Sequence, residues 1–270
     1  MAILTLYVLN DWVLVTFVLI VCAALIWSSK QYLPVFFEQS KIVLNLGSVR
    51  EGERVIYNGL PWKIESLGYY CKLENPDLSG ASLRVNTKEL INAHSRRSEV
   101  LEPWFPTKKG DWVQVNDQYG KVFLQSPEQV IIQNIAGEKI YYAAKDFYQL
   151  SPRNFSHGYA IEFVFGLDYE LQATILSEVE KIFKAEVMQG FIALRPDLRH
   201  KISDLEVDFC EANSSSLDLR FFMRCDGSLA SERFSIERKL KSLCIEVCNQ
   251  HKYVIPFDQL TMHMEQERLS

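Results

Sequence analysis

The segment KKGDWVQVNDQYGKVFL, from Lys108 to Leu124, indicates how the chain is organised, because a related version of it occurs earlier in the chain. That earlier version, REGERVIYNGLPWKIESL, runs from Arg50 to Leu67. In both, a glycine beside an acidic residue opens a strand-like run, an Asn-centred turn follows, and a lysine with an aliphatic neighbour comes next. The constant offset of about 58 residues indicates an internal duplication. The matched positions are Gly52, Val55, Asn58 and Lys63 in the first copy and Gly110, Val113, Asn116 and Lys121 in the second.

Each copy is rich in short β-type runs separated by turn signals such as Asn58-Gly59 and Ala136-Gly137. We expect a small, strongly bent, SH3-like antiparallel sheet over residues 49–100 and a second one over residues 101–154. Neither sheet is large enough to enclose a generous core alone, so each is expected to stack against its twin or a neighbouring subunit. The joint EVLEPWFPTKK, residues 99–109, is expected to be an extended connector held by burial of its aromatic rings.

The N-terminal residues 1–29 are predicted to form one transmembrane helix. The run WVLVTFVLIVCAALIW, from Trp12 to Trp27, contains Thr16 as its one conventional polar side chain, and a bilayer core needs roughly 20 apolar residues. Trp12 and Trp27 stand at opposite ends, where amphipathic rings favour the membrane interface, and Lys30 follows directly. A cleaved signal peptide is the alternative, but no lysine or arginine precedes Lys30 to form a basic n-region.

The first positive charges, Lys30 and Lys41, both follow this helix, so the positive-inside rule places the N-terminus outside and the rest in the cytoplasm. The six cysteines have no spaced disulfide framework, and we interpret them as reduced and mostly buried. Residues 30–48 form a second apolar-rich stretch with helical spacing, predicted to be a connecting helix. Its face of Tyr32, Phe36, Val43 and Leu46 suits either the membrane surface or packing on the following domain.

The pattern changes after residue 154, and residues 155–270 predict a ferredoxin-like α+β domain. Alternating strands and two helical runs follow in the order β-α-β-β-α-β, which is the split βαβ arrangement. The expected strands are Tyr159–Phe165, Leu205–Phe209, Leu217–Met223 and Gln259–Met264, and the expected helices are Glu170–Met188 and Ser231–Gln250.

Composition and motifs exclude several classes of function. A net charge of −5 argues against a dedicated nucleic-acid binder, which carries a basic footprint. The common hydrolase and nucleotide-binding motifs do not occur, so we predict no catalytic residues, no cofactor and no enzymatic activity. Cys244, Cys248 and His251 have helical spacing, but a structural zinc site usually needs four ligands, so core packing is the preferred interpretation and no metal site is predicted. The short basic patches Ser95-Arg96-Arg97 and Lys108-Lys109 are interpreted as solvated loop charges, with anionic headgroups as the alternative if they lie near a membrane.

With these features assembled, the sequence resembles the small-conductance mechanosensitive channel family (MscS-like). A membrane helix precedes a β module with a GDxV…GxV pattern, a second segment leads into a strand and an Asp-Tyr pair, and a terminal segment resembles IPFPQxDVxL. The residues that carry the resemblance are Gly110-Asp111-Trp112-Val113 and Gly120-Lys121-Val122; Asp146-Phe147-Tyr148, Pro152-Arg153-Asn154-Phe155-Ser156 and Phe165-Gly166-Leu167-Asp168-Tyr169; and Ile255 to Met264.

The resemblance implies a homo-oligomeric ring, of seven subunits in known members, in a bacterial inner membrane, with a periplasmic N-terminus and cytoplasmic C-terminal domains. It implies a central pore for ions or small solutes that responds to membrane tension or osmotic stress. It also marks Gly110, Asp111 and Gly120 as the turn residues of the β module. Helical spacing gives the candidate pore-lining face, Thr16, Leu19, Ile20 and Ala23.

The sequence also departs from the family pattern. Family channels have at least three membrane helices, whereas this chain has one, and their pore helix is rich in Gly and Ala, whereas this span contains Ala23 and Ala24 alone. The β module is doubled. A plain membrane anchor therefore remains the alternative for the helix. A non-conducting ring scaffold that organises another membrane protein remains the alternative function.

Overall fold

The computed structural model describes residues 12–256 of the 270-residue chain. The chain divides into two compact units, each held together mainly by packing within itself. Unit 1 comprises residues 1–110 and 120–152, and unit 2 comprises residues 111–119 and 153–270. The chain therefore passes from one unit to the other inside the second predicted β module.

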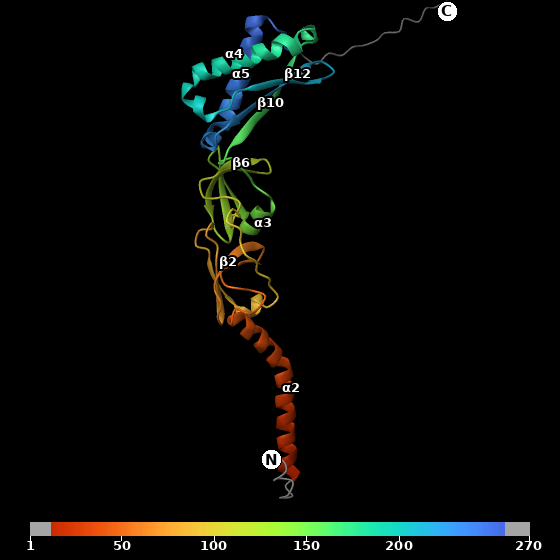
Figure 1. Cartoon of the computed structure of the whole chain (residues 1–270), viewed down its shortest axis with the longest axis vertical. Coiled ribbons are helices and arrows are strands. Elements are labelled where there is room, and N and C mark those ends of the chain that lie inside the picture. Colours follow the sequence, from red (N-terminus) through yellow and green to blue (C-terminus); the bar gives the residue numbers. More distant parts are fainter. Residues whose placement is uncertain (1–11, 257–270) are drawn as a thin grey trace, which may run out of the picture. The chain divides into compact units, whose positions relative to one another are not determined.

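A single helix, α2, runs from Trp12–Val43 over 32 residues. The sequence predicts a membrane segment up to residue 29 and a separate helix after it, but the helical backbone continues through this boundary. The polar pair Ser28-Ser29 does not break a helix, because the Ser29 hydroxyl donates a hydrogen bond of 2.8 Å to the Ile26 carbonyl. Pro34 lies inside the helix, where a proline removes one backbone hydrogen bond and favours a bend; Figure 1 shows α2 bent along its length.

The first β module is an antiparallel sheet in the order β1-β2-β3-β4, followed by the short 3₁₀ helix η1. Asn58 and Gly59 join β1 to β2 with φ values of 51° and 79°. Positive φ at both central residues is the geometry of the two-residue hairpin that Asn-Gly favours, so this turn prediction is confirmed. The elements are β1 Arg54–Tyr57, β2 Leu60–Ser66, β3 Tyr70–Glu74, β4 Ser82–Asn86 and η1 Thr87–Leu90.

The second copy contributes three strands to unit 1, and β6 pairs with β7 and β7 with β8, all antiparallel. A short helix, α3, follows β8 in the place that η1 occupies after β4. The strand β6 begins in unit 2 and continues in unit 1 from Gly120. The elements are β6 Gln118–Gln125, β7 Gln129–Asn134, β8 Lys139–Ala143 and α3 Ala144–Gln149.

The backbone repeats the duplication at equivalent positions. Gly52 has a φ of 77°, and its N–H donates to the Ile64 carbonyl oxygen at 2.8 Å; Gly110 has a φ of 100°, and its N–H donates to the Val122 oxygen at 2.8 Å. Positive φ is a conformation that glycine adopts without steric cost, which explains the repeated glycine. The bulge between Ile64 and Ser66 has its counterpart between Val122 and Leu124. The turn residues Asn58 and Asn116 have φ values of 51° and 52°.

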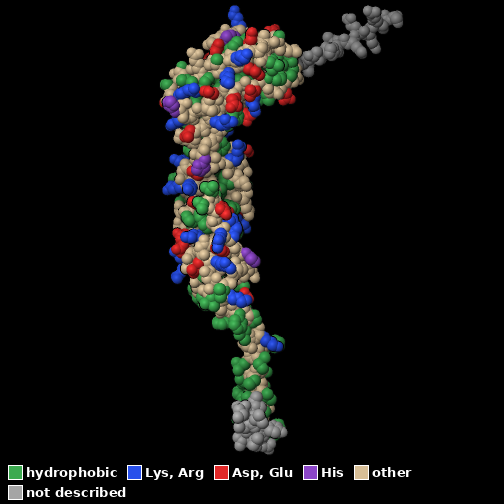
Figure 2. Space-filling view, viewed as in Figure 1, with side chains coloured by type: hydrophobic (Ala, Val, Ile, Leu, Met, Phe, Trp, Pro, Cys, Tyr) green, Lys and Arg blue, Asp and Glu red, His purple; other side chains and the backbone are tan. Residues whose placement is uncertain are grey.

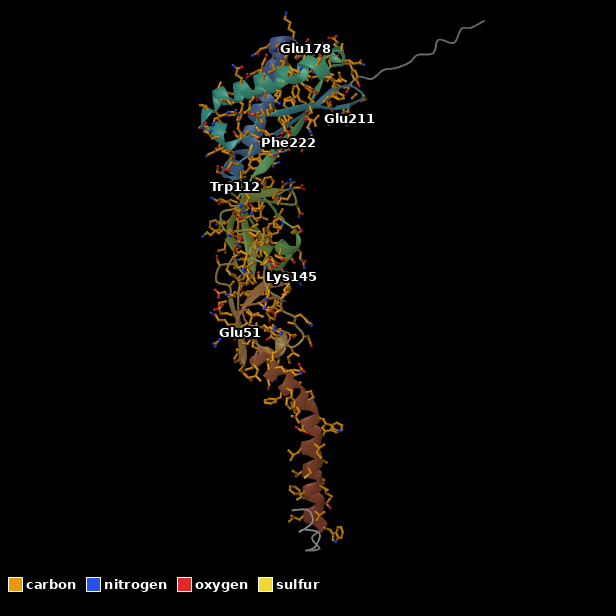
Figure 3. The ribbon with its side chains drawn as sticks, in the orientation of Figure 1. Glu51, Trp112, Lys145, Glu178, Glu211 and Phe222 are labelled. Carbon is orange, nitrogen blue, oxygen red and sulfur yellow. The ribbon has the colours of Figure 1, made fainter. Side chains whose placement is uncertain are left out.

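The two β modules contact one another within unit 1, which is one of the two arrangements expected from the sequence. The Ser79 N–H donates to the Gln125 carbonyl oxygen at 2.9 Å. The buried side chain of Gln125 donates to the carbonyl oxygens of Asp77 and, at 2.8 Å, of Thr107. The carbon chain of Lys145, on α3, lies over the first-copy hairpin at Gly59 (Figure 3). Small sheets that cannot enclose a core alone are stabilised by such stacking.

Unit 2 begins with β5 (Trp112–Val115), which pairs antiparallel with the short strand β9 (Arg153–Asn154). The C-terminal domain then forms a three-stranded antiparallel sheet in the order β10-β12-β11. The helices α4 and α5 contact each other and the sheet (Figure 1). Its main elements are β10 Tyr159–Leu167, α4 Glu180–Leu194, β11 Glu206–Ala212, β12 Leu217–Cys225 and α5 Arg233–His251, with a π-helical turn at Ile175–Val179.

This arrangement is the predicted ferredoxin-like α+β fold, with the first and third strands of the domain adjacent. The predicted closing strand, Gln259–Met264, and most of the third family-like segment lie outside the described residues. Phe221 is central to the core: its ring stacks on Phe163 at 5.0 Å and meets the edge of Phe183 at 5.8 Å. Both helices thus bury their apolar faces against the same side of the sheet.

Candidate functional site

The helix α2 is the one candidate membrane span among residues 12–256. Its most apolar window has a mean hydropathy of 2.3, and Figure 2 shows hydrophobic side chains along it, whereas charged side chains are spread over the rest of the described chain. At about 1.5 Å per residue, the helix rises about 27 Å from Trp12 to Lys30. This length matches the roughly 30 Å hydrocarbon core of a bilayer, so the composition and length of α2 suit a membrane anchor.

The predicted interface residues stand at the two ends of this apolar part. Trp12 and Trp27 are 57% and 78% exposed, and the side chain of Lys30 is also exposed. Their spacing along a continuous helix places the two indole rings about 22 Å apart along its axis. Their role at the interface stays a prediction.

The predicted pore-lining residues, Thr16, Leu19, Ile20 and Ala23, are all helical and exposed in the single chain. The hydroxyl of Thr16 donates to the Trp12 carbonyl oxygen at 2.8 Å. The polar atom is therefore satisfied within the helix and is tolerated facing either lipid or a lumen. The assignment of this face to a pore stays a prediction.

The C-terminal part of α2 leaves a wide apolar face exposed. Tyr32 and Phe36 are 66% and 62% exposed, whereas Ile42 is buried where α2 meets the first β module. The face that includes Tyr32 and Phe36 is thus not covered by the described residues of this chain. The sequence left two settings open for this face, the membrane surface and packing on the following domain. Because the described residues do not cover it, the face is available to a membrane surface.

The predicted turn residues of the second β module have distinct structural roles. Gly110 requires positive φ, whereas Gly120 is required by a close approach of two strands: a Cβ there would overlap the Gln133 carbonyl oxygen and lie 2.6 Å from Cγ2 of Ile132. Asp111 Oδ2 accepts a hydrogen bond of 2.7 Å from the Asn154 side-chain amide.

Asp111 belongs to a network that joins two of the family-like sequence segments within unit 2. The Asn154 oxygen accepts a hydrogen bond from the Ser156 N–H at 3.0 Å, and the Ser156 hydroxyl accepts one from the Trp112 N–H at 2.7 Å. The Phe155 N–H donates to the Trp112 carbonyl oxygen at 2.8 Å. The GDWV and RNFS segments, about 40 residues apart in sequence, are therefore one structural unit.

An aromatic cluster around Arg233 continues from this network into the C-terminal domain. The guanidinium carbon of Arg233 lies 5.6 Å from the ring centre of Tyr119 and 5.1 Å from that of Phe155. The Tyr119 hydroxyl donates to the Ala230 carbonyl oxygen at 2.7 Å, and burial raises the pKa of Tyr119 to about 12. The phenol is thus a neutral hydrogen-bond donor over the physiological range, and the cluster holds the start of α5 against Tyr119, near the start of β6, and Phe155, the residue after β9.

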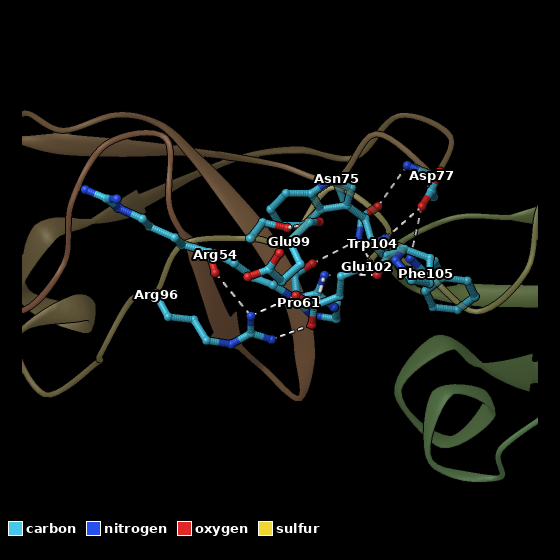
Figure 4. Close-up of polar contacts among 12 residues, drawn as sticks. Arg54, Pro61, Asn75, Asp77, Arg96, Glu99, Glu102, Trp104 and Phe105 are labelled. Carbon is cyan, nitrogen blue, oxygen red and sulfur yellow. Dashed lines mark hydrogen bonds and ion pairs between the residues drawn. The ribbon is translucent and has the colours of Figure 1, made fainter.

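The connector between the modules is held by polar side chains as well as by its rings (Figure 4). Phe105 is buried as predicted, and its ring stacks on Phe147 at 5.9 Å. Asp77 Oδ2 accepts hydrogen bonds from the backbone N–H groups of Trp104 and Phe105 at 2.9 and 3.1 Å. The buried amide of Asn75 donates to the carbonyl oxygens of Pro61 and Trp104 at 2.9 and 3.1 Å. Sequence patterns did not indicate these roles, since Asn75 and Asp77 resemble ordinary turn residues.

Arg54 is the second feature that sequence analysis missed. Its side chain is 4% exposed, donates to the Pro103 carbonyl oxygen at 2.9 Å and lies 4.9 Å from the ring centre of Trp104. Its guanidinium also lies 3.6 Å from a carboxylate oxygen of Glu102, which is paired with Arg96. A buried arginine needs such paired and aromatic partners to offset its desolvation. The cluster therefore pins the connector to the first module.

We expect this cluster to make the stability of the protein depend on pH in an acidic window. Hydrogen bonding to Arg96 lowers the pKa of Glu102 from 4.5 to about 2. Because the folded pKa is depressed, the stabilisation is fully present above pH 4.5 and is lost as the pH falls through about 2. We expect the difference in thermal unfolding midpoint between the native chain and Glu102→Gln to shrink across this window in detergent.

The matched control for this measurement is Glu102→Gln introduced into an Arg96→Gln background, where the charged partner is missing. In that background, the effect of Glu102→Gln on the unfolding midpoint should be nearly independent of pH. If the difference in unfolding midpoint between the native chain and Glu102→Gln stayed constant from pH 4.5 to pH 2, the Arg96–Glu102 pair would not contribute to the pH dependence of stability.

The cysteine positions favour core packing on α5. Cys244 and Cys248 are buried in the C-terminal core, and burial raises the pKa values of their thiols to about 12 and about 11. His251 Nε2 lies 2.7 Å from Glu186 Oε1, and its ring stacks on Tyr253. Buried thiols with raised pKa values are poor nucleophiles and poor metal ligands. Within residues 12–256, Cys71 and Cys225 are also buried, Cys22 is partly exposed, Cys210 is exposed, and all six thiols are free.

Comparisons with known proteins give matches among solved structures. No family model matches the sequence, and no curated protein matches it. The crystal structure of Helicobacter pylori MscS in its closed state is similar to this chain, with a TM-score of 0.46 and 18% sequence identity over 60% of each chain. The cryo-EM structure of Arabidopsis thaliana MSL1 is similar with a TM-score of 0.40 and 13% identity, over 57% of this chain and 54% of that one. The matched part thus spans less than two thirds of either relative.

Proposed function

We propose that this protein is a subunit of an MscS-like mechanosensitive channel, a homo-oligomeric ring with a central pore that opens under membrane tension or osmotic stress. One observation supports the proposal most strongly: Asp111, Asn154 and Ser156 join the GDWV and RNFS segments through hydrogen bonds. These segments follow the apolar helix α2 in the chain. These are the segments on which the sequence resembles that family. The ferredoxin-like domain follows them in the order that the resemblance implies.

The exposed surface of α2 supports assembly through several copies. A helix with apolar side chains on all its faces suits contact with lipid or with other membrane helices, and a closed ring needs identical head-to-tail contacts between copies of the chain. In the proposed assembly the helices surround the axis, with Thr16, Leu19, Ile20 and Ala23 toward the lumen. The proposed location is a bacterial inner membrane, with the N-terminus periplasmic and the folded domains cytoplasmic.

A direct test applies suction to membrane patches from liposomes that contain the purified full-length protein. We expect discrete conductance steps whose open probability rises with tension. Light scattering of the same preparation in detergent should report a multiple of the chain mass. Assembled rings that stay silent at tensions up to membrane rupture would overturn the channel and favour the non-conducting scaffold. A monomer at every concentration would overturn both.

A matched pair of substitutions tests the orientation of α2. Ile20 lies on the predicted lumen face and Leu25 on the opposite face, and their side chains are similarly exposed in the single chain, at 62% and 63%. A narrow apolar neck conducts when it is wetted, so Ile20→Asn is expected to leak ions without applied tension. Leu25→Asn faces lipid and should leave resting conductance unchanged. Equal leak from both variants, or from neither in assembled rings, would contradict the predicted pore face.

A further inference from the structure

The two β modules differ sharply in charge at one equivalent location. In the first copy, Lys63 forms an ion pair of 3.5 Å with Glu65, and Glu51, labelled in Figure 3, accepts a hydrogen bond from the Leu67 N–H at 2.7 Å. At the offset of about 58 residues, the counterpart of Lys63 is Lys121. The counterparts of Glu65 and Glu51 are Phe123 and Lys109, so both carboxylates are replaced in the second copy.

The replaced residues line a pocket in the second copy. The pocket has a volume of about 420 Å³ and is lined by Lys109, Gly110, Lys121, Val122, Phe123 and Gln133. All of these residues belong to unit 1. Gly110 is one of the lining residues, and a Cβ at this position would lie 4.0 Å from Cε of Lys121.

The pocket is cationic, and no carboxylate is among its lining residues. The side chains of Lys109 and Lys121 are exposed, and neither takes part in an ion pair with any residue of the described chain. At the rim, the ammonium group of Lys139 lies 4.1 Å from the ring centre of Phe123, which is 46% exposed. Lys109 and Lys121 therefore line this pocket without a paired carboxylate, whereas the equivalent Lys63 of the first copy is paired with Glu65.

We propose that this pocket of the second β module binds a phosphate-bearing anion, which the first module does not bind. Ammonium groups act as point charges toward phosphate, and several of them at a concave surface favour a multiply charged anion. Phe123 supplies an apolar wall for the organic part of a phosphate ester. The anion is either a free phosphate compound or the headgroup of an anionic lipid, and both present the same chemistry to the lysines. The proposal does not rest on channel activity, because all of the lining residues come from one chain.

Titration calorimetry on the full-length protein in nonionic detergent tests the proposal with two probes. Inorganic pyrophosphate represents the free anion, and dihexanoyl phosphatidylglycerol represents the lipid headgroup, with dihexanoyl phosphatidylcholine as the neutral-headgroup reference. We expect saturable binding of at least one anionic probe, and the probe that binds identifies the source. Raising the salt concentration should weaken this binding, because exposed charges are screened.

The duplication provides the matched variants. Lys109→Glu combined with Phe123→Glu gives these two positions the residue types of the first copy. Lys121→Ala removes one ammonium group from the pocket. Each of these variants is expected to weaken anion binding at least tenfold. Lys63→Ala removes the equivalent lysine of the first copy and should leave binding unchanged. Absence of binding by both anionic probes, or an equal loss in Lys63→Ala, overturns the proposal.

Discussion

Phe221→Ala is expected to lower the free energy of unfolding of the C-terminal domain by about 3–5 kcal/mol. The Phe221 ring is fully buried between the sheet and the helices, where it contacts Phe163 and Phe183. Truncation removes these contacts and leaves a cavity that surrounding rings cannot fill without leaving their rotamers. Differential scanning calorimetry of the full-length protein in detergent measures the loss as a lower transition midpoint.

Phe222→Ala is the matched control for this prediction. Phe222 is the next residue of β12, so its side chain points to the opposite face of the sheet, where it is half-buried (Figure 3). The same number of atoms is removed, but far less contact is lost, and the destabilisation should be well under half that of Phe221→Ala. Similar losses from the two variants would show that the core does not centre on Phe221.

Gly120→Ala is expected to destabilise the second β module by about 2–3 kcal/mol through overpacking. The new methyl group would overlap the Gln133 carbonyl oxygen and crowd Ile132, so strands β6 and β7 would have to separate locally. Hydrogen exchange of the full-length protein in detergent should show faster exchange in β6 and β7, together with a lower unfolding midpoint.

Gly68→Ala provides the comparison for this effect. Gly68 also lacks a positive φ, and the nearest atom to a Cβ there is the Tyr70 carbonyl oxygen at 3.4 Å, which is an ordinary contact. Alanine should be neutral or slightly stabilising at Gly68, because it restricts the unfolded chain. If Gly120→Ala were as stable as Gly68→Ala, the inference that β6 and β7 approach too closely at Gly120 for a side chain would be contradicted.

Local patterns predicted the parts of the fold that depend on local physics. The Asn58-Gly59 hairpin follows from the φ preferences of its two residues, and the ferredoxin-like order follows from the alternation of strand and helix periods. The predicted boundary at residue 29 differs from the structure because it marks the end of the apolar run, whereas the helical backbone continues to Val43. A helix continues through polar residues when their hydroxyls bond to its own carbonyl groups, as Ser29 does.

The candidate site was predictable only in part. Gly110 was identified from the duplicated pattern and Gly120 from the family resemblance, and their structural reasons differ, since Gly110 needs positive φ and Gly120 needs space beside another strand. The burial of Arg54 gives no sequence signal, because a charged residue on a short strand normally faces solvent. Its partners, Pro103 and Trp104, lie about 50 residues away and come close only after the connector folds back.

The membrane-compatible helix, the two related β modules and the order of the C-terminal domain could be predicted from local patterns, because periodicity, turn propensity and repetition are properties of neighbouring residues. The tertiary structure alone decided which polar groups are brought together: the Arg54 cluster, the Asp111–Asn154–Ser156 network and the lysine pocket of the second module. These arrangements depend on contacts between segments distant in the chain, whose energies exist only once the strands have paired and the connector is in place.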